Sequence, residues 1–239
     1  MHVERRRLLL MRHGAVDYFD AAGRPYPPDD VPLTAYGVAQ ARAMGEALAA
    51  HRVAPDRVVT SGLRRTRETA QHVLAAAHLT VPVEHWPDLQ EIRGGKLSAI
   101  RDDELRDAFL AAFEGAVARE TRFLGGETIG ELLDRVLPAL QRLLADERWD
   151  TALLVAHGGV NRAVLSWFLT GRSAFFGGLA QDAGCLNVID VGPTPATSVV
   201  RVVNFCAIDA LRTGTRLSTM EELLLKYLKS RDRPEPEPT

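Results

Sequence analysis

The sequence is poor in cysteine and contains no long apolar run. Its two cysteines, Cys185 and Cys206, are too few for a disulfide framework, and no CxxC spacing indicates a metal or redox pair. We therefore expect both to be buried as small apolar side chains. The N-terminal apolar run from Leu8 to Met11 is too short for a signal peptide or a membrane span, and no later stretch is long enough either. These absences predict a cytoplasmic protein that does not contact a membrane.

Charge of one sign is not in excess either. Twenty-nine Lys and Arg residues oppose 31 Asp and Glu, which leaves a formal charge of −2 and no bulk attraction to nucleic acid or an anionic membrane. The 239 residues are 46% hydrophobic, as in ordinary globular proteins. We find no internal repeat or linker-like shift in composition. We expect one domain over residues 1–230, followed by a disordered Pro- and Glu-rich tail over 231–239.

Short apolar runs alternate with longer amphipathic segments along the chain. Strands are expected at residues 8–11, 57–61, 81–86, 151–156, 186–191 and 198–205. Helices are expected at residues 34–51, 63–77, about 104–113, from 158 past 167, and 220–228. Pro82 places its strand at an edge of the sheet. The alternation predicts an α/β fold, a three-layer αβα sandwich with a mostly parallel central sheet.

Polar residues follow four of the expected strands. These residues are Arg12-His13-Gly14, Ser61 to Arg65, Leu89-Gln90-Glu91 and His157-Gly158-Gly159. A single histidine near a strand end is most often structural, and a single arginine is most often solvated. In parallel sheets, however, sites form in the crevice beyond the carboxyl ends of the strands, so that four separate segments converge there. The sequence therefore predicts a functional site at this edge.

The residue types at this edge suit a phosphoryl group. Arginine forks bind phosphate oxygens two at a time, and a helix N-terminus adds backbone donors. His13 between such cations should stay neutral, so that its imidazole can attack phosphorus. The carbonyl of Gly14 is a candidate acceptor that would set the tautomer of His13, and glycine there allows a sharp turn. Phosphoryl transfer needs mainly positioning and charge neutralisation, which this set supplies.

Several segments in this order resemble one known family. LLLMRHG, PLTAYGVAQA, SGLRRTRETA, LQEI, GGET and LLVAHGGV are similar to motifs of the histidine phosphatase superfamily, which has the phosphoglycerate-mutase-like fold, and the resemblance covers Leu8 to Phe205. It implies catalysis without a metal or cofactor. By this resemblance, His13 is the nucleophile that forms phosphohistidine, and Arg12 and Arg65 clamp the phosphoryl oxygens. His157 is a cationic hydrogen-bond donor to the transferring group, and Gly158 adds its backbone N–H. Glu91 is the carboxyl group that acts as acid and base.

The sequence departs from the family pattern after RHG. Many members carry Glu at the next position and Asn a few residues on, where this chain has Ala15 and Phe19. Because Ala15 removes one candidate carboxylate, Glu91 becomes the main candidate for the proton donor. Asp17 and Glu127 are left open as residues that share this role, although Glu127 is expected to begin the following helix as an early-turn acid. We expect Arg64 to face solvent, and Ser61 to be either a helix-start cap or a ligand contact.

The residues after RHG also indicate which reaction is catalysed. They do not match the Trp- and Asn-containing loop of cofactor-dependent phosphoglycerate mutases, and this difference favours hydrolysis of a small phosphomonoester. Mutase-type transfer and a non-catalytic phospholigand-binding protein stay as alternatives. The sequence does not favour a metallohydrolase, because no HExxH motif accompanies the histidines. It does not favour a nucleotide-binding module either, because it contains no glycine-rich phosphate-binding motif.

Two further segments concern the substrate and the oligomeric state. Residues 92–125 are expected to form a lid, and the balance of six basic and six acidic residues between Arg93 and Arg122 predicts a substrate with modest additional charge. The apolar helix around Met220–Leu228 packs either on the body or on a second subunit, which leaves a homodimer open.

Overall fold

One six-stranded sheet forms the centre of the protein. The structure is a computed structural model that describes residues 5–19, 26–211, 213–214 and 216–231. The order across the sheet is β3 (Val83–His85), β2 (Arg57–Thr60), β4 (Thr151–Ala156), β1 (Arg6–Arg12), β5 (Leu186–Val191) and β6 (Val199–Phe205). The first four strands are parallel, and β5 and β6 run antiparallel to their neighbours. The expected mostly parallel sheet is confirmed, and β3, which follows Pro82, lies at an edge as predicted.

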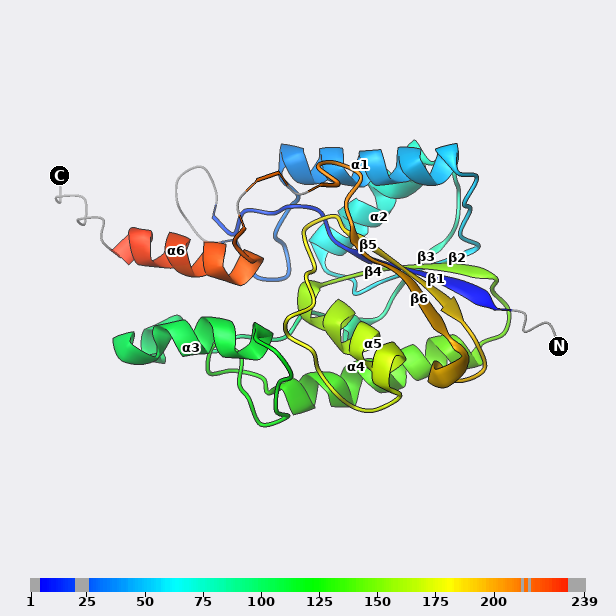
Figure 1. The fold of residues 1–239 in the computed structure, drawn as a ribbon. Helices are drawn as coiled ribbons and strands as arrows, with labels where there is room; N and C mark the ends of the chain where they lie inside the picture. The colour runs from blue at the N-terminus through cyan, green and yellow to red at the C-terminus, as the bar shows by residue number, and fades with distance from the viewer. Residues whose placement is uncertain (1–4, 20–25, 212, 215, 232–239) are drawn as a thin grey trace.

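Helices cover both faces of this sheet. Helices α1 (Ala35–Ala50) and α2 (Arg64–Ala76) lie on one face, and α4 (Ile129–Ala145) and α5 (Gly158–Thr170) lie on the other (Figure 1). Alternate residues of β1 supply both interfaces, because successive side chains of a strand point to opposite faces. Leu8 and Leu10 pack with residues of α4 and α5, whereas Leu9 and Met11 pack with residues of α1 and α2. The three-layer αβα architecture is thereby confirmed.

Side-chain caps determine where two of the helices begin. Thr34 caps α1 as expected, its hydroxyl accepting from the N–H of Gly37. Helix α4 begins after Thr128, which forms a capping box with Glu131. Glu127 therefore precedes the helix, and the expectation that it is an early-turn acid of that helix is wrong.

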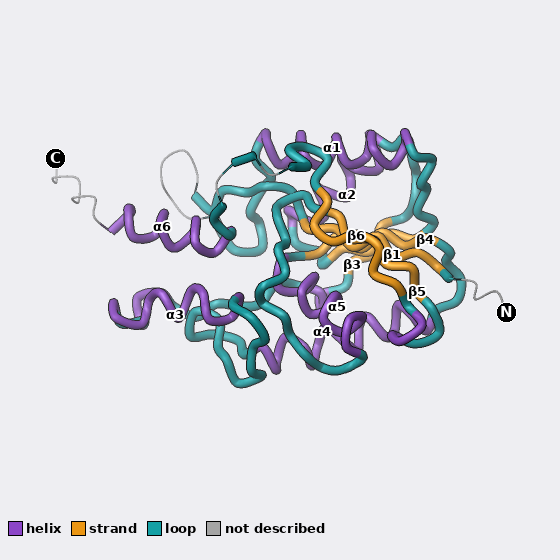
Figure 2. Tube along the Cα trace, viewed as in Figure 1, coloured by secondary structure: helices purple, strands orange, loops and turns teal. Residues whose placement is uncertain are grey.

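The segment between β3 and α4 is helical and irregular. It contains α3 (Leu105–Leu110), shorter than the stretch expected around 104–113, and, as expected, no strand among its described residues. Helix α6 (Thr219–Arg231) lies beside α3 at the end of the molecule where the parallel strands finish (Figures 1 and 2). The rings of Phe109 and Tyr227 meet there with centroids 5.7 Å apart. The C-terminal helix thus packs on the body of the same chain, while the expected tail lies outside the described residues beyond Arg231.

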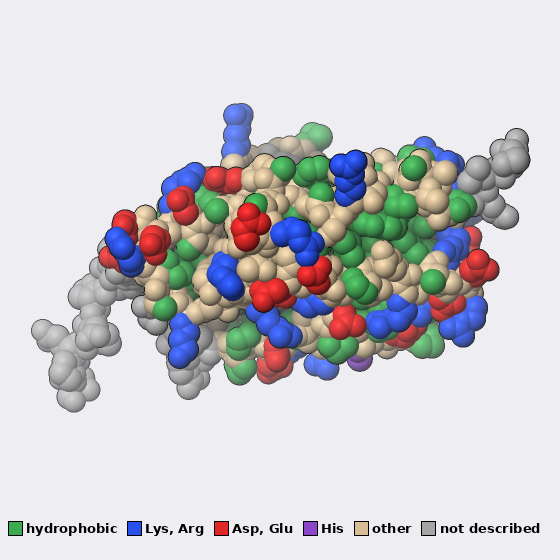
Figure 3. All heavy atoms as spheres, turned by 90° about the horizontal axis from the view of Figure 1, so that it is seen from below, with side chains coloured by type: hydrophobic (Ala, Val, Ile, Leu, Met, Phe, Trp, Pro, Cys, Tyr) green, Lys and Arg blue, Asp and Glu red, His purple; other side chains and the backbone are tan. Residues whose placement is uncertain are grey.

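The remaining expectations concern cysteines, charge and membranes. Cys185 and Cys206 are both buried, as expected. On the face seen in Figure 3, the described basic and acidic side chains are interspersed, in keeping with the balanced composition. Within the described ranges, no helix combines the length and the apolar character needed to cross a bilayer.

Candidate active site

The residues singled out from the sequence converge where the parallel strands end. Arg12 is the last residue of β1, Arg65 is the second residue of α2 after β2, and His157 directly precedes α5 after β4. These three side chains and His13 are buried, with 9% (Arg12), 5% (Arg65), 0% (His157) and 3% (His13) of their surface exposed. The two imidazole rings meet edge to face, with centroids 5.2 Å apart. The predicted convergence therefore occurs, around a pair of histidines.

The imidazole of His13 is held in one orientation and is uncharged. Its Nδ1 lies 2.8 Å from the carbonyl oxygen of Gly14. Burial, and then the charges of Arg65 and Arg12, hold the pKa of His13 well below 6.5. A neutral ring that donates from Nδ1 keeps a lone pair on Nε2. Both the neutral state and the Gly14 contact agree with the sequence-based expectation.

The loop that carries His13 is anchored to both helices of one layer. The N–H of Gly14 donates to Thr69 Oγ1 of α2 at 3.0 Å, and the N–H of Ala15 donates to Gln40 Oε1 of α1 at 2.8 Å. A Cβ atom on Gly14 would collide with the carbonyl of Gly37. Gly14 has no positive φ angle, so a close approach to α1, rather than a sharp turn, requires glycine here.

The two predicted clamp arginines have unused donors. Arg12 donates from Nη1 to the carbonyl of Gln181 at 2.5 Å and to Thr219 Oγ1 at 3.0 Å. Arg65 donates from Nη1 to the carbonyl of Pro28 at 2.9 Å. Within the described part of the chain, neither guanidinium has an acid partner at ion-pair distance, and the Nε atoms of both are buried without a hydrogen bond. Burial lowers the pKa of Arg65, although the group stays cationic at neutral pH.

His157 is also neutral in the protein without a ligand. The resemblance implies a cationic side chain on the transferring phosphoryl group; in the absence of that group, burial, followed by the charges of Arg65 and Arg12, holds its pKa well below 6.5. The free protein therefore contains a neutral His157. Its Nε2 lies 2.8 Å from Ser61 Oγ, while its Nδ1 is buried without a partner.

Three nitrogen atoms at this site share an unusual property. Among the described residues, they are the buried side-chain polar atoms that lack a hydrogen bond: Arg12 Nε, Arg65 Nε and His157 Nδ1. Buried polar groups are otherwise almost always paired, and an unpaired one destabilises the folded state. Three such atoms beside one neutral imidazole are the arrangement expected of a site for a ligand with several acceptor oxygens.

Glu91 sits at the start of α5. Its Oε1 accepts the N–H of Ile92 at 2.9 Å, and both its oxygens accept the N–H of Gly159 at 3.1 Å. A Cβ atom at position 159 would lie only 2.5 Å from Glu91 Oε1, so glycine is needed for the carboxylate to come this close. The N-terminus of a helix also favours a negative charge. Gly158, the other predicted backbone donor, lies in the first turn of α5, where N–H groups have no partner within the helix.

The two alternative proton donors do not share this placement. Asp17 is exposed, and its Oδ1 accepts the N–H of Phe19 at 3.3 Å. Glu127 receives bonds from Arg135 at 2.7 and 2.9 Å. Burial acts to raise the pKa of Glu127, but the bonds from Arg135 and from the N–H of Arg93 outweigh it and lower the pKa. Glu127 is therefore ionised and already paired, which leaves Glu91 as the carboxyl group at the site.

Arg64 and Ser61, which lie near Arg65 in the sequence, make different contacts. Arg64 forms an ion pair with Glu68 at 2.7 Å and is partly exposed, as expected. Ser61 does not cap α2, since Leu63 occupies the N-cap position and makes no side-chain cap bond. The hydroxyl of Ser61 bonds to His157 instead.

A cleft of about 170 Å³ opens beside these residues. Besides Arg12, Glu91 and Gly158, its walls include residues that the sequence analysis did not single out, namely Phe113, Arg162, Gly177, Gly178, Leu179, Ala180, Ser218, Thr219 and Met220. Arg162 follows Gly158 by four positions and so lies on the same face of α5, a signal that the sequence did contain. No local signal marks Thr219, which reaches Arg12 from α6 through the tertiary fold.

Arg162 is a third buried cation at this site. It donates from Nε to the carbonyl of Gly177 at 2.9 Å and from Nη1 to that of Gly158 at 3.1 Å. Burial and the charge of Arg12 lower the pKa of Arg162 to about 10, so it is charged at neutral pH. Across the described ranges, no group of three or more His, Cys, Asp or Glu residues is placed to hold a metal ion.

Comparison with known proteins agrees with this geometry. A family model described as "Histidine phosphatase superfamily (branch 1)" matches residues 8–204. The chain belongs to the histidine phosphatase superfamily. The resemblance stated from the sequence motifs is thereby confirmed.

Curated relatives include two kinds of enzyme. The chain is 29% identical over 170 residues to a 6-phosphofructo-2-kinase/fructose-2,6-bisphosphatase of Gallus gallus, covering 70% of this chain and 34% of that protein. It is also 29% identical over 160 residues to a metal-independent phosphoserine phosphatase of Arabidopsis thaliana, covering 66% of each. The chain thus spans about a third of the length of the bifunctional relatives.

Solved structures of phosphatases share the fold. A putative alpha-ribazole-5'-P phosphatase of Escherichia coli superposes with a TM-score of 0.64 at 26% identity, covering 84% of this chain and 96% of that one. A mycobacterial glucosyl-3-phosphoglycerate phosphatase in complex with VO3 superposes with a TM-score of 0.65 at 27% identity, covering 83% and 98%.

Proposed function

We propose that the protein is a phosphomonoesterase that hydrolyses a small phosphorylated metabolite through a phosphohistidine intermediate at His13. The observation that carries this proposal is the set of three unpartnered buried nitrogens of Arg12, Arg65 and His157 around a neutral His13 ring. A phosphoryl group has acceptor oxygens that would give these nitrogens the hydrogen bonds they lack. The phosphatase names of several relatives support the same reaction class.

In the first step, the lone pair on His13 Nε2 attacks phosphorus. The N–P bond forms while the bond from phosphorus to the leaving oxygen breaks. Arg12 and Arg65 neutralise the charge that is spread over the equatorial oxygens, and the carbonyl of Gly14 stabilises the proton that stays on Nδ1. Glu91 in its protonated form donates its proton to the leaving oxygen, so that an alcohol departs.

In the second step, water attacks the phosphorus of phosphohistidine. The Glu91 carboxylate accepts a proton from this water, the N–P bond breaks, and inorganic phosphate leaves with His13 neutral again. The backbone N–H groups of Ile92 and Gly159 hold the carboxylate in place for this role. Dividing one difficult displacement into two easier ones is the ordinary gain from covalent catalysis.

The cleft and its charges suggest the size and charge of the substrate. Its volume of about 170 Å³ is below the roughly 300–1,000 Å³ of pockets for drug-sized ligands. Three arginines of the proposed lid are neutralised by nearby acids: Arg101 by Asp103, Arg106 by Asp107 and Glu114, and Arg119 by Asp134. Arg162 is left as a cation beside the phosphoryl site. A phosphomonoester with at most one further negative charge fits this balance.

Trapping the intermediate tests the proposal. The wild-type protein is mixed with an aryl phosphate labelled on phosphorus and quenched in base, where phosphohistidine survives. We expect labelled protein and released phosphate from the wild type, and neither from His13→Ala, whose turnover should fall at least about a hundredfold because the nucleophile is lost. Labelling or substantial turnover by His13→Ala would identify another nucleophile. Turnover without any trapped label in the wild type would favour direct attack by water.

A panel of phosphorylated metabolites then tests the substrate class. We expect the fastest phosphate release from small monoesters that carry at most one additional negative charge. A steep preference for bisphosphates would contradict the charge argument. Vanadate should inhibit competitively without added metal, because it adopts the five-coordinate geometry of the transferring group.

A further inference from the structure

The first turn of α6 touches the phosphoryl site. Thr219 is the first residue of α6 and lies in the wall of the cleft, and its Oγ1 accepts a hydrogen bond from Arg12 Nη1 at 3.0 Å. Helix α6 begins after the residues 8–204 that match the family model. The proposed mechanism uses Arg12 but has not yet used this contact.

Thr219 and Gln181 together occupy one nitrogen atom of Arg12. The Nη1 atom donates both to the carbonyl of Gln181 and to the hydroxyl of Thr219, which uses its two hydrogens. Among the residues that the structure describes, nothing accepts a hydrogen bond from Nε or Nη2 of Arg12. Because a guanidinium group is planar, two acceptors on Nη1 fix the direction in which the edge formed by Nε and Nη2 points.

The edge formed by Nε and Nη2 is the one with which arginines of this protein bind pairs of oxygens. Two exposed ion pairs bind both oxygens of a carboxylate in this way: Arg101 with Asp103, and Arg148 with Asp146. On Arg12 the same edge is free, and a Cβ atom at Gly158 would lie 3.7 Å from Nε, so the edge lies beside the start of α5. Two parallel N–H groups at this place suit two oxygens of a phosphoryl group.

A capping box and apolar packing fix the position of Thr219. Ser218 Oγ accepts the N–H of Glu221 at 3.3 Å, and the Glu221 carboxylate accepts the N–H of Ser218 at 2.6 Å, which defines where α6 begins. Apolar side chains at helical spacing pack one face of α6 against the core that includes α3: Met220, Leu223, Leu224 and Tyr227. The position of the Thr219 hydroxyl therefore follows from the docking of α6 on α3.

We propose that Thr219 is a positioning residue that accepts a hydrogen bond from Arg12 Nη1 and thereby directs the Nε–Nη2 edge of Arg12 at two oxygens of the phosphoryl group. This inference rests on the proposed function, because it takes a phosphoryl group as the ligand of Arg12. No covalent bond changes at Thr219. The competing role for Thr219 is direct contact with the organic part of the substrate, since the residue also lines the cleft.

Vanadate inhibition distinguishes the two roles, because vanadate has no organic part. Thr219→Val removes the hydroxyl and keeps the shape of the side chain, at a position that is exposed in the cleft wall. We expect the inhibition constant of vanadate to rise about tenfold and kcat/KM for an aryl phosphate to fall about tenfold, because Arg12 Nη1 loses an acceptor. A lower kcat/KM with an unchanged vanadate constant would assign Thr219 to the organic part of the substrate and overturn the inference, as would no change in either value.

Thr219→Ser tests whether the hydroxyl itself is responsible. This variant retains the acceptor for Arg12 and should recover most of the loss in both measurements. A serine variant that is as impaired as Thr219→Val would show that the shape of the side chain matters and not its hydrogen bond, which contradicts the inference.

A double-mutant cycle tests whether Thr219 acts through Arg12. In Arg12→Met no guanidinium group remains to be oriented, so adding Thr219→Val should lower kcat/KM for a nitrophenyl phosphate by less than about twofold more. A second tenfold loss in the double variant would mean that Thr219 acts independently of Arg12, and the inference would then be wrong.

Thr213→Val is the matched control. Thr213 precedes α6 and is exposed, and its hydroxyl donates to Asp209 Oδ1 at 3.0 Å. Removing this hydroxyl should leave the vanadate constant and kcat/KM within about twofold of the wild type. An equal loss in Thr213→Val would attribute the Thr219 effect to a general loosening of the C-terminal segment and overturn the inference. The trapping experiment at His13 tests the proposed function separately, since vanadate binding is measured without reference to the nucleophile.

Discussion

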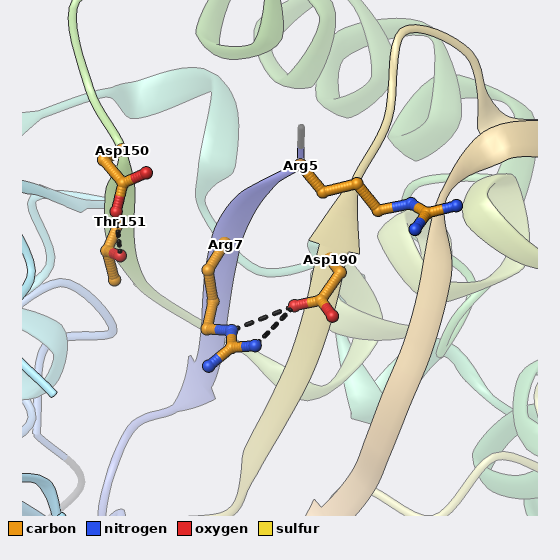
Figure 4. Close-up of a pocket in the computed structure, with 5 residues that line it drawn as sticks. All are labelled: Arg5, Arg7, Asp150, Thr151 and Asp190. Carbon is orange, nitrogen blue, oxygen red and sulfur yellow. Dashed lines mark hydrogen bonds and ion pairs between the residues drawn. The ribbon is translucent and has the colours of Figure 1, made fainter. Parts of the chain in front are cut away.

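The two ends of β1 use arginine in opposite ways. At its start, the Nε and Nη2 atoms of Arg7 lie 2.9 Å from Asp190 Oδ1, and Arg201 binds the other oxygen at 2.7 Å (the Arg7–Asp190 pair is drawn in Figure 4). At its end, Arg12 donates to a backbone carbonyl and a threonine hydroxyl, with no acid partner at ion-pair distance in the described part of the chain. An arginine whose charge is cancelled within the fold has little charge left for a ligand.

Burial makes this contrast sharper. The Arg7 side chain is 46% exposed, so water shares in its solvation, whereas only 9% of Arg12 is exposed. A buried charge without a partner destabilises the folded state by several kcal/mol. The carboxyl end of the sheet therefore carries an electrostatic strain that a bound anion would relieve. Arginines therefore indicate an anion-binding site when no acid of the protein pairs with them, as at Arg12 and Arg65. The presence of arginines alone does not.

The largest difference between the two ends should appear on replacing each arginine by lysine. Arg12→Lys should lower kcat/KM for an aryl phosphate about a hundredfold, because an ammonium group cannot reproduce the planar fork on two oxygens. Arg7→Lys should stay within about twofold of the wild type, since its partner is an internal carboxylate. Equal losses in the two variants would mean that the Arg12 effect is a general consequence of altered folding.

Acid should act on the two ends in different pH ranges. His13 and His157 have lowered pKa values, so below pH 6.5 the unfolded chain binds protons that the folded chain does not. The free energy of unfolding should therefore fall as pH is lowered through 6.5, by at most about 1.4 kcal/mol per pH unit for each histidine. At Asp190, burial acts to raise the pKa, but hydrogen bonds from Arg201 and Arg7 outweigh it and lower the pKa. Its stabilising contribution is present above its unfolded pKa of about 4 and is lost only as pH falls below that value.

Urea unfolding between pH 7.5 and 5 measures the histidine part. The slope should be reduced in His157→Asn and unchanged in His51→Gln, because His51 is exposed at the end of α1. A wild-type stability that does not change over this range would show that the two buried rings are not held neutral.

Leaving-group dependence examines the carboxyl end further. Glu91→Gln keeps the shape of the side chain but cannot exchange a proton, so hydrolysis of alkyl phosphates should slow about tenfold more than hydrolysis of a nitrophenyl phosphate, whose leaving oxygen needs no proton. The measurement is the ratio of kcat/KM for the two substrates in the variant and the wild type. The same loss for both substrates would remove Glu91 from the role of proton donor.

Local sequence patterns were sufficient for the strands and for the convergence of the site. The largely apolar segments at 151–156 and 186–191 match β4 and β5 residue for residue, because strands that are buried on both faces leave a clear signal. The placement of His13, Arg65 and His157 together followed from the rule that parallel strands end at one edge. What a strand's apolar pattern does not encode is its direction, so the antiparallel β5 and β6 were not foreseen.

The features missed at the site depend on tertiary contacts. Ser61 and His157 are separated by 96 positions in the chain, and nothing near either residue identifies the other as its partner. The charge state of His157 depends on how deeply the fold buries it beside Arg65, which no motif records. Thr219 meets Arg12 only because α6 packs against α3, and the connecting loop carries no readable pattern.

The smallest predicted effect concerns the amino end of the sheet alone. Asp190→Asn removes the charge that binds Arg7 and Arg201, whose side chains are 46% and 54% exposed and can be solvated by water instead. The free energy of unfolding in urea should fall by about 1 kcal/mol or less, the range of ion pairs at a protein surface, and kcat/KM should not change. A clear fall in kcat/KM in a variant whose free energy of unfolding is little changed would show that this end of the sheet is energetically coupled to the phosphoryl site along β1. Unchanged activity would support the conclusion that the paired arginines serve the fold and that the unpaired ones serve the ligand.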